Sequence, residues 1–261
     1  MLRTVTLTLL LAFTSLSSVL ASDLEREARL AQEIEDQIVV GDPLYLSADG
    51  HGFLTIYTAA ETERPRGTAI ILHGRGFHPD WPQVTAPLRE RLPEAGWSTL
   101  SIQLPVLGKE AKYYDYVPIF AESRPRIQAA IAHAREHSTN PVVLVAHSCG
   151  VHMAMDYVDN TGDADFDGFI GIGMGATDYG QPMKRPFPLA AMRVPTMDVH
   201  GSEDYPAVLS QAADRLADMR VAGHPGSRQR VVDGGNHYFD NEASLDDLVD
   251  TIVDWLNGTQ F

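Results

Sequence analysis

The residues best suited to chemistry in this sequence are a serine and its small neighbours, Ala146-His147-Ser148-Cys149-Gly150. They follow the most apolar run of the chain, Pro141–Ala146, and precede a stretch with helical spacing. A serine at a tight turn from a strand into a helix is exposed at the strand end, and the turn needs small residues two positions before and after it. Ala146 and Gly150 meet that need. The pattern therefore predicts that Ser148 is a nucleophile.

A serine hydroxyl is a weak nucleophile and needs a base, which in turn needs an acid to orient it. His237 follows the last expected strand and a Gly-Gly turn, so it is the candidate base. Asp204 follows the preceding strand and is the first candidate for the acid, with Glu203 as the alternative. Asp178, after an earlier strand, is a weaker alternative. Serine, then acid, then histidine is one of the known chain orders for such triads.

Acyl transfer also needs fixed hydrogen-bond donors for the oxyanion of its intermediate. We expect one from the backbone N–H of Cys149 and one from the backbone N–H of Arg75, with Gly76 as second choice. Arg75 lies in a glycine-containing loop after an apolar strand, and no Gly-Lys-Ser/Thr follows to make this loop a nucleotide P-loop. Side chains of nearby loops are candidates to line a substrate pocket: Phe77, Tyr113, Tyr114, Met174 and Tyr238.

Metal and cysteine chemistry are disfavoured by the spacing of the residues concerned. Of the ten histidines, the five near the expected site lie on separate turns, and His147 and His152 do not share one helical face. These five are His73, His78, His147, His152 and His200. Cys149 is the only cysteine, which excludes an intramolecular disulfide and cysteine-rich metal sites. The Gly-x-Cys-x-Gly spacing that a cysteine nucleophile would require is not present. We therefore expect no metal and no cofactor.

The elements that must position these residues alternate between strands and helices. Strands are expected at residues 43–47, 53–59, 68–72, 97–104, 141–146, 166–172, 196–199 and 229–232. Helices are expected at residues 83–94, 124–137, 151–158, 207–219 and 244–255. Asp49-Gly50 predicts a hairpin between the first two strands, and the alternation predicts a mostly parallel sheet covered on both faces. Two long segments outside the pattern, 105–123 and 173–194, are expected to be lids or pocket walls.

Together these features resemble the α/β-hydrolase superfamily. The resemblance runs from about Leu44 to the C-terminus and implies an α/β-hydrolase fold, with a mostly parallel central sheet, helices on both faces and an N-terminal antiparallel hairpin. It names no substrate, since the superfamily includes esterases, lipases, thioesterases, peptidases and non-catalytic members. Two segments, His73–Pro82 and Thr99–Pro105, look like a group of exported bacterial proteins known as a domain of unknown function. The features that carry the superfamily resemblance are the hairpin, His73-Gly74-x-Gly76, Ala146-x-Ser148-x-Gly150, Asp204 and His237.

The N-terminus has the pattern of an export signal. A short positively charged start, an apolar stretch and the exit Val19-Leu20-Ala21 predict a signal peptide over residues 1–21. Residues 22–42 are expected to form an N-terminal helical arm, and residues 43–261 one α/β-hydrolase domain. The apolar stretch is short for a membrane span, and no later segment approaches that length. We therefore expect an exported protein, periplasmic or secreted, with no stable membrane span after leader cleavage.

The formal net charge of −15 makes nucleic acid an unfavourable partner, because an acidic surface repels phosphate. The expected function is hydrolysis of a small-molecule or lipid-like carboxylic ester, through Ser148, His237 and Asp204 and an acyl-enzyme. A peptidase, amidase or thioesterase on the same triad is one alternative, and a non-catalytic binding protein on a hydrolase fold is another. The chain is expected to be a monomer or a weak oligomer.

Overall fold

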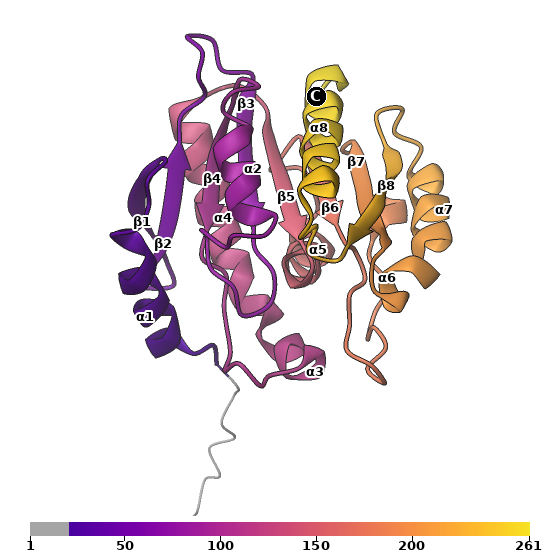
Figure 1. Cartoon of the computed structure of the whole chain (residues 1–261), viewed down its shortest axis with the longest axis horizontal. Coiled ribbons are helices and arrows are strands. Elements are labelled where there is room, and N and C mark those ends of the chain that lie inside the picture. Colours follow the sequence, from indigo (N-terminus) through magenta and orange to yellow (C-terminus); the bar gives the residue numbers. More distant parts are fainter. Residues whose placement is uncertain (1–20) are drawn as a thin grey trace, which may run out of the picture.

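The computed structural model describes residues 21–261, which contain one eight-stranded sheet (Figure 1). The strands in chain order are β1 (Asp42–Ala48), β2 (His51–Thr58), β3 (Gly67–Leu72), β4 (Trp97–Ile102), β5 (Val142–His147), β6 (Gly168–Ile172), β7 (Thr196–Glu203) and β8 (Arg228–Asn236). Their order across the sheet is β1-β2-β4-β3-β5-β6-β7-β8. The β1–β2 and β2–β4 pairs are antiparallel and all the others are parallel. The predicted fold class is confirmed.

The hairpin between β1 and β2 has its turn at Asp49-Gly50, as the sequence pattern predicted. Asp49 and Gly50 have φ angles of 51° and 78°. Two-residue hairpin turns with positive φ match the natural twist of the strands, and aspartate followed by glycine adopts them readily. The hairpin thus supplies the antiparallel edge of the sheet.

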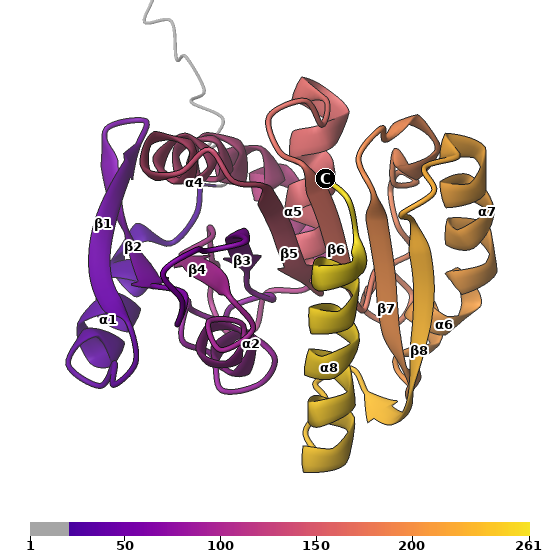
Figure 2. The same cartoon turned by 90° about the horizontal axis from the view of Figure 1, so that it is seen from above.

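Helices cover both faces of the sheet. Figure 2 shows α4 and α5 over one face and α2 and α8 over the other. The helix expected over residues 207–219 is two helices, because Gln211, with ψ −2°, interrupts the helical ladder. The segment 105–123, expected to be irregular, contains one short α-helix and a 3₁₀ segment, Val117–Glu122. The α-helices are α1 (Leu24–Glu35), α2 (Thr85–Arg91), α3 (Tyr113–Tyr116), α4 (Ser123–His137), α5 (Cys149–Thr161), α6 (Pro206–Ser210), α7 (Ala212–Ala222) and α8 (Glu242–Gly258).

The position of β5 inside the sheet explains why its sequence is apolar without interruption. Its side chains alternate between two cores: Val142, Leu144 and Ala146 pack in the core under α4 and α5, whereas Val143 and Val145 pack in the core under α8. A parallel strand buried on both faces needs apolar residues at every position. This strand ends at the middle of the sheet, so it delivers the residue that follows it to the centre of the carboxyl edge.

The helix α1 is docked on the hairpin end of the sheet. Ala31 and Ile34 pack on Leu54 of β2, and the Glu27 carboxylate receives a 2.8 Å hydrogen bond from the Arg126 guanidinium of α4. Both side chains of this ion pair are buried. The signal peptide expected over residues 1–21 lies, apart from its last residue, outside the described residues. Within the described range, no helix is both long enough and apolar enough to cross a membrane.

Candidate active site

Ser148 lies at the turn from β5 into α5 and has a strained backbone. Its φ and ψ angles are 56° and −118°, which non-glycine residues rarely adopt. A Cβ atom at Gly150 would lie 2.5 Å from the carbonyl oxygen of Leu72 and 2.7 Å from that of His73, so only glycine fits there. Ala146, two residues before the serine, is fully buried. The glycine that helped to predict Ser148 is therefore required by the close approach of β3.

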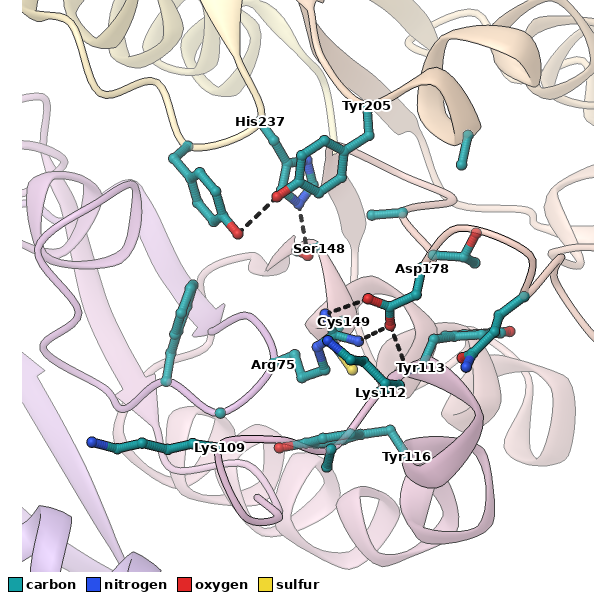
Figure 3. A pocket seen from close by; sticks show the side chains of 18 of the residues that line it. Arg75, Lys109, Lys112, Tyr113, Tyr116, Ser148, Cys149, Asp178, Tyr205 and His237 are labelled. Carbon is teal, nitrogen blue, oxygen red and sulfur yellow. Dashed lines mark hydrogen bonds and ion pairs between the residues drawn. The ribbon is translucent and has the colours of Figure 1, made fainter.

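Ser148, His237 and Asp204 form one hydrogen-bonded chain at the carboxyl edge of the sheet. His237 Nε2 lies 2.8 Å from Ser148 Oγ (Figure 3), and His237 Nδ1 lies 2.7 Å from Asp204 Oδ1. The side chains of His237 and Asp204 are 2% and 0% exposed. When Nδ1–H donates to the carboxylate, Nε2 is free to accept the proton of the serine hydroxyl. The arrangement can therefore activate the hydroxyl.

The structure distinguishes between the three carboxylates that were candidates to orient His237. Asp204 follows directly after β7, and its Oδ1 accepts hydrogen bonds from both His237 and the backbone N–H of Tyr205. Glu203 is the last residue of the strand, and its side chain is exposed. Asp178 instead pairs with the guanidinium of Arg75. Asp204 is thus the carboxylate that contacts the histidine.

The two residues expected as oxyanion donors, Arg75 and Cys149, line the pocket into which Ser148 opens. Cys149 is the first residue of α5, where backbone N–H groups have no acceptor inside the helix. In the part of the chain that the structure describes, neither backbone N–H donates to a protein acceptor. The described residues therefore leave both groups without a protein acceptor.

Two buried histidines hold the backbone around the site. His73 Nδ1 donates to the carbonyl of Gly74 over 2.8 Å, and its Nε2 accepts from the backbone N–H of Leu104 over 2.9 Å. His147 Nε2 donates to the carbonyl of His237 over 2.9 Å. The first set of bonds fixes the loop after β3, and the second fixes the loop that carries the base.

The buried histidines are expected to make the stability of the protein depend on pH. Burial lowers the pKa of His73 and His147 to about 3 and that of His152 to about 4. Below pH 6.5 the unfolded chain binds protons at these rings, whereas the folded protein does not until pH 3 to 4. The free energy of unfolding is therefore expected to fall between pH 6.5 and 4, by roughly 2 kcal/mol for each ring at pH 5. Urea unfolding at pH 8 and pH 5 measures this loss.

The control for that prediction is His137→Ala, which removes an exposed histidine on α4 instead of a buried one and should keep most of the loss of stability between pH 8 and pH 5. His152→Gln should reduce it. Equal unfolding midpoints at pH 8 and pH 5 in the unsubstituted protein would contradict the prediction.

A pocket of about 990 Å³ opens above Ser148, and aromatic rings form much of its wall. Phe77, Tyr113 and Tyr238, expected as lining residues, border it. Tyr205 was not anticipated, although it directly follows the acid: its ring stacks on His237 at 4.2 Å, and its hydroxyl donates to that of Tyr238 over 2.8 Å. The tyrosine pair shields one side of the histidine.

The expectation that Met174 lines the pocket is wrong. Its side chain is fully buried and belongs to the core under α5. The chain turns at Gly173, with φ 62°, and Met174 fills the space that Gly171 leaves: a Cβ atom there would lie 2.5 Å from the methionine Cγ and Sδ atoms. Gly173 in turn makes room for the base, because a Cβ atom on it would lie 2.8 Å from His237 Cε1.

An ion pair that the sequence did not indicate joins three loops at the pocket. The guanidinium of Arg75 donates to both carboxylate oxygens of Asp178, which also accepts the backbone N–H of Tyr113 over 2.7 Å (Figure 3). Burial raises the pKa of Asp178, but these hydrogen bonds outweigh it and hold the pKa below its usual value. The carboxylate is therefore ionised at neutral pH, and it ties the expected oxyanion loop to the loop after β6.

Neither Cys149 nor a cluster of metal-binding side chains offers a second reactive centre in the described residues. Burial raises the pKa of the Cys149 thiol to about 12, so it stays protonated at neutral pH and is a poor nucleophile. Within residues 21–261, no three histidine, cysteine, aspartate or glutamate side chains are grouped closely enough to hold a metal ion.

Solved structures with a similar fold are hydrolases and their homologues. An alpha-beta serine hydrolase homologue from Coxiella burnetii is 19% identical, with a TM-score of 0.61 over 83% of this chain and 97% of its own. A dienelactone hydrolase from Anabaena variabilis is 16% identical, with a TM-score of 0.64 over 85% and 98%. A soluble variant of monoglyceride lipase from Saccharomyces cerevisiae is 13% identical, with a TM-score of 0.62 over 86% and 97%. At these identities the likeness shows a shared fold.

No curated protein matches the sequence of this chain. One family model does, over residues 17–115 and 119–256, which together span most of the sequence. Its description is "Protein of unknown function (DUF3530)". The protein therefore belongs to the DUF3530 family and has the α/β-hydrolase fold.

Proposed function

We propose that the protein is a serine hydrolase that cleaves carboxylic esters through Ser148, His237 and Asp204. The observation that carries the proposal is the unbroken hydrogen-bonded chain from Ser148 Oγ through His237 to Asp204, with contacts of 2.8 and 2.7 Å. A serine, a base and a buried acid in this geometry serve for nucleophilic acyl transfer on unrelated folds. Two structural neighbours, named as a dienelactone hydrolase and a monoglyceride lipase, support an ester as the substrate.

In the first half of the reaction, Ser148 Oγ attacks the ester carbonyl while His237 Nε2 accepts the hydroxyl proton. Asp204 stabilises the imidazolium that forms and keeps Nδ1 protonated. The carbonyl oxygen becomes an oxyanion, which accepts hydrogen bonds from the backbone N–H groups of Cys149 and Arg75. Backbone donors held by the fold stabilise a developing charge without reorganisation. His237 then gives its proton to the departing alcohol, leaving the acyl group on the serine.

In the second half, water attacks the acyl-enzyme and His237 accepts a proton from it. The tetrahedral intermediate collapses, the acid product leaves, and Ser148 Oγ recovers its proton from the ring. The balance is one ester and one water converted to one acid and one alcohol. The chemistry requires no electron transfer, and His237 relays each proton that moves, one from Ser148 and one from the water.

A fluorophosphonate probe tests the proposal, because it forms a covalent bond with an activated serine oxygen. The unsubstituted protein should be labelled, and Ser148→Ala should not. Ser210→Ala, which removes an exposed hydroxyl on α6, is the matched control and should be labelled like the unsubstituted protein. Equal labelling of the unsubstituted protein and Ser148→Ala would refute Ser148 as the nucleophile.

The choice of an ester is tested with substrates that share one acyl group. We expect a 4-nitrophenyl hexanoate ester to be hydrolysed faster than the corresponding 4-nitroanilide or an alkyl thioester. Preferential cleavage of the anilide would instead assign the site to an amidase. Labelling by the probe without hydrolysis of any of the three would contradict the ester assignment.

A further inference from the structure

The charged side chains around the pocket have the opposite sign from the protein as a whole. The chain carries a formal net charge of −15. The residues that line the pocket include four cations and only two acids, which leaves an excess of two positive charges at its mouth. The four cations are Arg26, Arg75, Lys109 and Lys112, and the two acids are Glu33 and Asp178. A local excess of this sign in an acidic protein attracts anions to the pocket.

The lysines are concentrated at this site to an unusual degree. The sequence contains three, at positions 109, 112 and 184. Lys109 and Lys112 line the pocket, and the ammonium of Lys184 lies 3.6 Å from the ring centre of Tyr114, whose neighbour Tyr113 lines it too. The other residues that carry a positive charge at neutral pH, with histidine counted as neutral, are arginines. All lysine ammonium groups therefore gather on one side of the molecule, around the loops that form the pocket.

The cations at the mouth differ in how far the protein neutralises them. Asp178 accepts hydrogen bonds from Arg75, and the charge of Lys112 adds to the lowering of its pKa. The guanidinium of Arg26 donates to the carbonyls of Gly76 and Leu107, which are uncharged acceptors. In the described part of the chain, neither Lys109 nor Lys112 forms an ion pair with a carboxylate. Both side chains are exposed, and the nearby Asp178 carboxylate is already hydrogen-bonded to Arg75.

The position of the two lysines relative to the triad indicates which part of a bound substrate they would contact. Both come from the segment between β4 and α3, and in Figure 3 they lie across the pocket from His237. A substrate whose carbonyl carbon lies at Ser148 would extend its far end toward them. Glu110 and Asp115, which are close to the lysines in sequence, do not line the pocket.

We infer that the preferred substrates are esters that carry an anionic group at the end distant from the scissile bond, and that Lys109 and Lys112 bind this group. The inference rests on the proposed esterase function and specifies its substrate class. A carboxylate or a phosphate has the required chemistry, since either accepts charge-assisted hydrogen bonds from an ammonium. The apolar and aromatic wall then holds the chain between the two ends.

The test compares two esters that differ only in terminal charge. The 4-nitrophenyl ester of hexanoate and the mono-4-nitrophenyl ester of adipate have acyl groups of equal carbon number, ending in a methyl and a carboxylate. We expect kcat/KM for the adipate ester to exceed that for the hexanoate ester by about tenfold, because two ammonium groups contribute. The ratio should fall toward one at high salt, which screens exposed charges.

The double variant Lys109→Gln/Lys112→Gln should lower that ratio to about one. The matched control is Arg228→Gln/Arg230→Gln, which removes the same charge from exposed positions at the opposite end of β8 from His237. The control should keep the ratio of the unsubstituted protein. A ratio near one in the unsubstituted protein, or an unchanged ratio in the lysine variant, would overturn the inference while leaving the esterase function intact.

Two further measurements distinguish a failure of the proposed function from a failure of this inference, and identify the type of anion that binds. If the unsubstituted protein hydrolyses neither ester faster than Ser148→Ala does, the proposed function fails and takes this inference with it. Adipate monoamide and monobutyl phosphate, added as inhibitors at equal ionic strength, show which anion binds better. Inhibition by either one, and not by neutral hexanamide, supports the inference, whereas equal inhibition by all three contradicts it.

Discussion

Replacing His237 with alanine is expected to lower kcat for ester hydrolysis by about 10⁶-fold. Without the ring, no group lies within hydrogen-bond reach of Ser148 Oγ to take its proton, and the hydroxyl stays a weak nucleophile. The substitution is a clean one, because His147 donates to the main-chain carbonyl of residue 237, which alanine retains. Initial rates with a 4-nitrophenyl ester, together with circular dichroism and thermal unfolding, measure the effect.

His137→Ala serves as the control for that variant, since it removes an exposed histidine on α4, away from the pocket. It should retain the rate of the unsubstituted protein. A His237→Ala protein that is folded and loses less than tenfold in kcat would show that another group acts as the base, and the triad assignment would then be wrong.

Replacing Asp204 with asparagine is expected to lower kcat by about 10⁴-fold. The amide carries no charge to stabilise the imidazolium, and it favours the wrong tautomer of the His237 ring. The side chain is fully buried, so no water can replace the carboxylate. The substitution preserves the shape of the side chain. The decrease should therefore appear in kcat at an unchanged fold.

The matched control is Glu203→Gln, the same change of acid to amide one residue earlier. Because the Glu203 side chain is exposed and makes no contact with His237, its kcat should stay within about threefold of the unsubstituted value. The reverse pattern, with a large loss in Glu203→Gln and a small one in Asp204→Asn, would reassign the acid. Comparable losses in both variants would point to an effect on β7 as a whole.

Much of this site could be predicted from the sequence because the relevant physics is local. The turn after β5 brings the backbone so close to β3 that Gly150 has no room for a side chain, and that restriction is visible as a short motif. The alternation of strands and helices predicts parallel strands. Since the carboxyl ends of parallel strands share one edge, residues that follow such strands gather there. Ser148, Asp204 and His237 each follow one directly.

The choice between two adjacent acids required the tertiary structure. The strand β7 continues to Glu203, four residues beyond its expected end, and its pairing with β8 shifts register between Gly201 and Glu203. Neighbouring residues of a strand face opposite sides, so a shift of one position decides which carboxylate points inward. The same limit explains Met174: nothing in its neighbourhood of sequence shows that Gly171 leaves a space for it in the core.

The sequence by itself thus determined the fold class, the elbow at Ser148 and the strand ends that carry the base and the acid. The tertiary structure alone decided which contacts join the loops around the pocket. Arg75 meets Asp178 across 103 positions of sequence, and Arg26 of α1 reaches Gly76 across 50. Turn sterics and strand periodicity act over a few residues and leave a mark in the sequence. Contacts between loops depend on where the whole sheet places their ends, and no short pattern records that.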